Sequence, residues 1–134
     1  MTIYLSGPMT GYKDYNYPKF QKIAKDLRAK GFKVIDPATD VKPVLKGGRE
    51  ITIAEMHEMM NNNSITQDES WGCFLRGDII TIMKDCDAIY LLKGWKNSKG
   101  ARFERSCSKY MGFTEYREGD LGISYKRNKA KCSV

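Results

Sequence analysis

Two acidic residues in the C-terminal half of the chain have the types and spacing for chemistry on a sugar. Glu104 lies about one turn inside a predicted helix that begins near Gly100, and Asp78 lies on the preceding predicted helix. If both side chains reach one sheet edge, one carboxylate can attack or stabilise an oxocarbenium-like carbon while the other acid protonates the leaving group. This pair favours glycosidic chemistry. Two exposed helix carboxylates are the alternative.

The segment Asn97–Gly100 opens directly into the helix that carries Glu104. Free N–H groups and the positive end of the helix dipole attract an anion to such a site. The hydroxyl of Ser98 would suit a monophosphate, whereas a simple Asn or Ser helix cap without a ligand is equally compatible with the spacing. Four cations surround the segment: Lys93, Lys96, Lys99 and Arg102.

A second polar loop, Ser6–Gly11, follows the short apolar run Ile3–Leu5. Gly7 and Gly11 would let the backbone approach a ligand closely, and Ser6 contributes a hydroxyl. The loop is neither a Walker loop nor a GxGxxG motif, so by itself it does not define a nucleotide site.

Alternating strands and helices must position these residues. Apolar residues spaced as on one helix face follow Pro18, and a second strand ends at Asp36, which makes a β-α-β unit. Further elements are predicted as helix 72–84, strand 88–92, helix 100–111 and strand 113–116. The pattern predicts a single-domain, open α/β fold of the Rossmann or flavodoxin type, with a mostly parallel sheet of four to five strands flanked by helices. Ligands of such sheets bind outside the carboxyl ends of the strands.

The expected domain spans residues 1–125 and carries an insertion at about 38–70. Within it we expect a loop at 36–50, a helix at 51–60 with a Met-rich face, and a mobile polar connection at 61–70. The insertion could be a lid over the site or a plain surface loop.

The net charge is +7, but four of the cations lie in a basic tail at 126–134, and +3 remains without them. A phosphate-bearing small molecule is therefore a better partner than a nucleic-acid polymer, which would have to bind mainly to the basic tail. No apolar run approaches the roughly 18 residues of a membrane span, and the start lacks the pattern of a signal peptide. We therefore expect a cytoplasmic protein that does not associate with membranes.

Metal and cysteine chemistry are not indicated. The four cysteines are scattered, the one histidine, His57, is remote from them, and no zinc-ligand spacing occurs. A cysteine nucleophile would lack a base. We expect neither a metal nor another cofactor.

Three blocks of the sequence together resemble a known family. They are Ile3–Gly11 with Asn16–Phe20, then Trp71–Arg76 with Asp78, and finally Cys86–Trp95 with Asn97–Glu104. This combination is similar to small phage and bacterial proteins related to nucleoside 2-deoxyribosyltransferases and deoxynucleoside 5′-monophosphate N-glycosidases. The resemblance covers residues 1 to about 116, without the insertion.

The resemblance implies roles for individual residues. Glu104 would attack the anomeric carbon, Asp78 would assist departure of the base, and Tyr4 would lie near the sugar. Ser98 matches a phosphate-binding serine, and Gly7 and Gly100 match backbone positions that approach the ligand. A homodimer or larger homo-oligomer, with partner residues at the site, is also implied.

The function expected from this combination is hydrolysis of a (deoxy)nucleoside 5′-monophosphate to a free base and a sugar 5-phosphate. The loop Asn97–Gly100 departs from the Asp-Ser-Gly-Thr-like loop of transferases that act on unphosphorylated nucleosides. Deoxyribosyl transfer between bases and non-catalytic nucleotide binding remain the alternatives. Trp95 or Tyr12 could stack on the base, or could equally be packing residues.

Overall fold

The computed structural model describes residues 1–123 and 125 of the 134-residue chain, so the predicted basic tail lies outside the described residues. Its sheet has the strand order β2-β1-β3-β4, and every neighbouring pair is parallel. The strands are β1 (Thr2–Ser6), β2 (Lys33–Ile35), β3 (Ala88–Leu91) and β4 (Thr114–Arg117). The predicted α/β fold with a parallel sheet is confirmed, with four strands in the described part of the chain.

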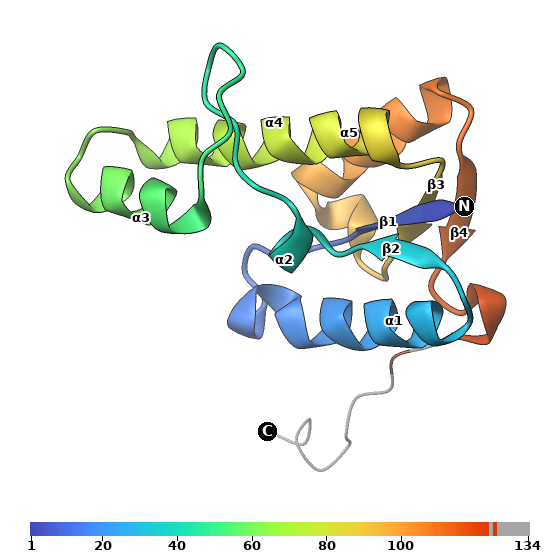
Figure 1. Ribbon diagram of the computed structural model, residues 1–134. Coiled ribbons are helices and arrows are strands. Elements are labelled where there is room, and N and C mark those ends of the chain that lie inside the picture. Colours follow the sequence, from blue (N-terminus) through green and yellow to red (C-terminus); the bar gives the residue numbers. More distant parts are fainter. Residues whose placement is uncertain (124, 126–134) are drawn as a thin grey trace.

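Helices cover both faces of the sheet (Figure 1). The long helix α1 (Tyr17–Ala29) packs on one face, and α4 (Gln67–Asp85) and α5 (Lys99–Tyr110) lie on the other. Successive residues of a strand point to opposite faces. Ile3 and Leu5 accordingly pack in the cluster that contains α1 residues, whereas Tyr4 packs in the cluster that contains Ile82 of α4. The strands β1 and β3 are buried on both sides, which explains the continuous apolar run of β3.

The chain reverses its direction of travel across the sheet between β1 and β3. From β1 it crosses by α1 to β2 on one side, and it later returns to β3 on the other side of β1. In open α/β sheets the crevice at such a reversal is where ligands bind. The loop after β1 and the start of α5 both lie at this edge of the sheet, because each follows the carboxyl end of a central strand.

The insertion is more ordered than the sequence predicted. A short helix α2 (Pro37–Asp40) forms inside the predicted loop 36–50, because the side chain of Asp36 accepts a hydrogen bond from Ala38 N. The helix predicted at 51–60 is α3 (Ile53–Asn61), which lies beside the first half of α4.

The prediction of a mobile connection through residue 70 is wrong for its last residues. Helix α4 begins at Gln67 rather than at 72, because Thr66 and Glu69 form a capping box that satisfies the first amides of the helix. Short 3-10 turns η1 (Lys13–Asn16), η2 (Trp95–Asn97) and η3 (Asp120–Gly122) complete the described elements. Within those residues, no helix combines the length and the apolar character needed to cross a membrane.

Two glycines of α4 provide a matched test of this packing. A Cβ added to Gly77 would lie 2.2 Å from the carbonyl oxygen of Lys42, whereas a Cβ on Gly72 would meet nothing within 4 Å. We expect Gly77→Ala to destabilise the fold by about 1–3 kcal/mol, because α4 must move away from the chain at Lys42. Gly72→Ala should stabilise it by about 0.5–1 kcal/mol through helix propensity. Urea unfolding of both variants measures the difference, and equal effects of the two substitutions would contradict the packing.

Candidate active site

Glu104 lies at the centre of the candidate site, with only 6% of its surface exposed. Its Oε2 accepts a hydrogen bond of 2.9 Å from the Tyr4 hydroxyl, and its Oε1 accepts one of 2.7 Å from the Ser6 hydroxyl. Tyr4 and Ser6 are two residues apart on β1, so both side chains leave the same face of the strand. One strand face therefore holds both oxygens of a carboxylate supplied by α5.

Asp78 of α4 lies next to Glu104 and Tyr4 and interacts with both side chains. Burial, and then the negative charge of Glu104, raise the pKa of Asp78 well above its ordinary value of 3.8. Burial also raises the pKa of Glu104, but hydrogen bonds from Ser6, Asp78 and Tyr4 oppose this by stabilising its charged form. The directions of these shifts favour a proton on Asp78 beside a charged Glu104.

Tyr4 serves this pair as a neutral hydrogen-bond donor. Its side chain is fully buried, and its pKa is raised well above 10.0 by that burial, followed by the electrostatic effect of the neighbouring carboxyl groups of Glu104 and Asp78. An ionised carboxylate beside a protonated one is the combination that glycosidic cleavage requires of its nucleophile and its acid. The structure thus brings together the three residues that the sequence suggested for catalysis: Tyr4, Asp78 and Glu104.

The start of α5 contains the predicted anion-binding segment. Ser98 is the N-cap, and its hydroxyl oxygen accepts a 3.2 Å hydrogen bond from Ala101 N. The cap is therefore formed, while the hydroxyl hydrogen can still be donated to a ligand. Gly100 borders open space, since a Cβ there would meet nothing within 4 Å. The four surrounding cations are exposed: Lys93, Lys96, Lys99 and Arg102.

The local structure explains why glycine stands at positions 7 and 11 of the loop after β1. A Cβ on Gly7 would lie 2.7 Å from Cβ of Leu92, so this position lets the loop after β1 pack directly on the end of β3. Gly11 adopts a φ of +85°, in the left-handed region that side chains rarely occupy, and it borders open space. Both residues shape the loop next to Ser6.

The two tryptophans lie in different surroundings. The Trp95 ring contacts the guanidinium groups of Arg105 and Arg117, with centroid distances of 5.5 and 5.6 Å, and packs against the cluster that contains Tyr4. Trp71 is 42% exposed, and Lys99 Nζ lies 5.3 Å from its ring centroid. Trp71 precedes Asp78 by two helical turns and therefore shares its side of α4. The seven-residue spacing between Trp71 and Asp78 is the sequence signal that places Trp71 on the side of Asp78.

Asp36 is a further acidic residue at this edge of the sheet. It follows β2, its side chain is buried, and burial is the main cause of its raised pKa. The pKa of Tyr17 is raised by burial, by Tyr15, and by the negative charges of Asp36 and Asp78. The sequence predicts that Asp36 lies at the carboxyl edge of the sheet, because it follows the second strand. Its burial could not be predicted, because it depends on how α2 folds over it.

No group of three or more His, Cys, Asp or Glu side chains within residues 1–123 is arranged to hold a metal ion.

Comparison with known proteins identifies a family. No curated protein matches the sequence. The model of one family, described as a domain of unknown function (DUF4406), matches residues 1–114, and this range includes Tyr4, Asp78, Ser98 and Glu104. With most of its length matched, the chain belongs to the DUF4406 family.

Proposed function

We propose that the protein cleaves the N-glycosidic bond of a (deoxy)nucleoside 5′-monophosphate and releases the base and the sugar 5-phosphate. The observation that supports this most is the pair of carboxyl groups: the buried Glu104 accepts hydrogen bonds from Tyr4 and Ser6, and burial and the charge of Glu104 raise the pKa of the neighbouring Asp78. Attack at a glycosidic carbon with protonation of the leaving group makes use of such a pair.

In the proposed reaction, a Glu104 oxygen bonds to C1′ while the C1′–N bond breaks. The electron pair of that bond goes to the base nitrogen, and the proton of Asp78 goes to the departing base. The product is a glycosyl ester of Glu104. Water then attacks C1′ and gives its proton to Asp78, which restores both carboxyl groups and frees the sugar 5-phosphate. Tyr4 and Ser6 keep Glu104 oriented throughout.

The start of α5 supports a phosphorylated substrate. The first amides of a helix have no partner one turn back, and the helix dipole is positive at this end. The Ser98 hydroxyl and the exposed cations Lys99 and Arg102 add to this attraction. Because Glu104 is in the second turn of the same helix, a phosphate held at its start would position C1′ against the nucleophile.

The test is incubation of the protein with a mononucleotide, with and without a second free base, followed by chromatography. Hydrolysis predicts free base in both reactions and sugar 5-phosphate as the accompanying product. A new nucleotide formed only when the second base is present would instead make the protein a transferase that uses the same ester. Tight nucleotide binding without any turnover would make it a binding protein.

Trp71 is the aromatic residue that we propose stacks on the base, because it is exposed and lies on the Asp78 side of α4. Loss of one base-stacking contact is worth about 1–3 kcal/mol. We therefore expect Trp71→Ala to raise KM for the mononucleotide about tenfold, with little change in stability. Trp95→Ala should mainly lower the midpoint of thermal unfolding, because its ring packs against the core and two guanidinium groups. Steady-state kinetics and thermal melts of both variants check this assignment, and the reverse pattern would refute it.

A further inference from the structure

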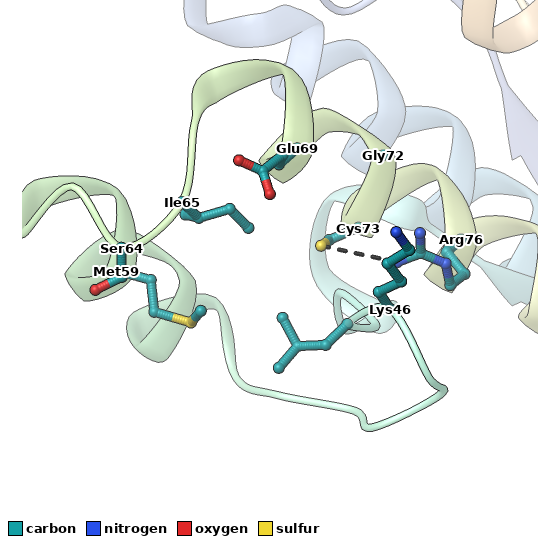
Figure 2. A pocket seen from close by; sticks show the side chains of 9 residues that line it. Lys46, Met59, Ser64, Ile65, Glu69, Gly72, Cys73 and Arg76 are labelled. Atoms are coloured by element: carbon teal, nitrogen blue, oxygen red, sulfur yellow. Dashed lines mark hydrogen bonds between the residues drawn. The ribbon is translucent and has the colours of Figure 1, made fainter.

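A concave site lies away from Glu104. A cavity of about 420 Å³ opens between α4, α3 and the loop that precedes α3 (Figure 2). Its volume lies within the roughly 300–1,000 Å³ that small-molecule pockets occupy. The apolar part of its wall comes from Leu45, Met59 and Ile65, and its charged groups are Lys46, Glu69 and Arg76.

The cavity faces the opposite side of α4 from the candidate active site. Glu69, Gly72, Cys73 and Arg76 follow one another at spacings of three, one and three residues, so they share one helix face. Asp78 comes two residues after Arg76, about 200° further around the helix. The cavity is therefore a separate site from the catalytic pair, with α4 as the wall between them.

The charged groups of the cavity leave a positive charge without a partner. Arg76 Nη1 donates a 2.5 Å hydrogen bond to the Val44 carbonyl and a weaker one of 3.8 Å to Cys73 Sγ, which fixes the guanidinium against the wall. Neither Arg76 nor Lys46 forms a salt bridge within the described residues. Glu69 is already engaged as the capping residue of α4, through a hydrogen bond from Thr66 N. Two cations against one carboxylate leave one net positive charge in the cavity.

We propose that this cavity binds a small amphipathic carboxylate. Its hydrocarbon part would contact Leu45, Met59 and Ile65, and its carboxylate would be bound by Arg76 and Lys46. The planar guanidinium of arginine matches a carboxylate with two parallel hydrogen bonds. A singly charged acid balances the net charge of the cavity, whereas a doubly charged phosphate would leave a negative charge next to Glu69.

Titration calorimetry of the full chain with octanoate tests the proposal, with octan-1-ol and octylammonium as probes of the same chain length. We expect saturable one-to-one binding of octanoate with a Kd at or below about 1 mM, and at least tenfold weaker binding of the neutral and cationic probes. Arg76→Gln should weaken octanoate binding about tenfold or more. Lys84→Gln removes an exposed cation of the same helix outside the cavity and should leave the binding unchanged.

Gly72→Leu is the second variant, because a Cβ at Gly72 would meet nothing within 4 Å and a leucine there would take up space in the cavity without replacing any of its charged residues. Loss of octanoate binding in this variant, with an unchanged far-UV circular dichroism spectrum, supports the assignment. The proposal is overturned if octanoate shows no saturable binding, if octylammonium binds as well, or if binding survives both Gly72→Leu and Arg76→Gln. None of these readouts depends on the glycosidase reaction.

Discussion

Replacing Glu104 with glutamine is expected to reduce base release from a mononucleotide by about 10⁴-fold or more. Glutamine has nearly the same shape and can still accept the hydrogen bond from Tyr4, but its amide oxygen is too weak a nucleophile to form the glycosyl ester. Because Glu104 is buried with a raised pKa, the neutral amide also removes a charge that the fold accommodates poorly. The variant should therefore fold and bind the nucleotide while losing turnover.

The measurement is kcat at saturating mononucleotide, together with the nucleotide Kd from calorimetry. Glu58→Gln, an exposed carboxylate of α3, is the matched control and should keep wild-type values of both. If Glu104→Gln retained activity within tenfold of wild type, Glu104 could not be the nucleophile.

Asp78→Asn is expected to lower kcat by about 10²–10⁴-fold, because the base would leave without a proton. The loss should be smallest for bases that depart readily as anions, since these need least help from an acid. A matrix of kcat values for several bases, in wild type and variant, measures this dependence. An equal loss for every base would argue that Asp78 only shapes the site.

The same variant should change how stability depends on pH. The folded pKa of Asp78 is raised above 3.8, so the folded state keeps a proton that the unfolded chain loses. Its contribution to stability is fully present below the unfolded pKa and is lost as the pH rises through the folded pKa. At neutral pH, wild type loses stability because Asp78 must take up a proton when the chain folds, and Asp78→Asn removes this cost. The variant should therefore melt at a higher temperature than wild type, and the difference between their melting temperatures should narrow toward pH 4. Thermal melts across pH 4 to 8 check this. A variant that melts below wild type by a constant margin throughout the range would contradict the burial of the pair.

The sequence predicted those parts of the fold that depend on local pattern. The apolar run Ala88–Leu91 reads as a buried parallel strand, and the spacing of apolar residues after Pro18 reads as one helix face. The start of α4 was misplaced because the capping box of Thr66 lies in a segment so polar that it resembles a loop. A capping box involves only a few neighbouring residues. The lack of apolar residues in the same segment favoured the prediction of a loop.

The candidate site required the fold as well as the sequence. Glu104 and Asp78 were identifiable as acids on neighbouring helices, but the alternative of two exposed carboxylates was removed only by the packing of α4 and α5 on β1, which buries Glu104 against Tyr4 and Ser6. The surroundings of Trp71 and Trp95 depend in the same way on long-range contacts. The contact of Gly77 with Lys42 likewise joins positions that no local pattern connects.

The most direct test of the account is a chromatographic screen for base release from all common and modified nucleoside 5′-monophosphates and their unphosphorylated nucleosides, with wild type and Glu104→Gln in parallel. We expect wild type to release the base from at least one monophosphate and to act much more slowly on the matching nucleoside. Glu104→Gln should release no base above the rate without enzyme. Absence of release from every monophosphate, or equal release by the two proteins, would contradict it.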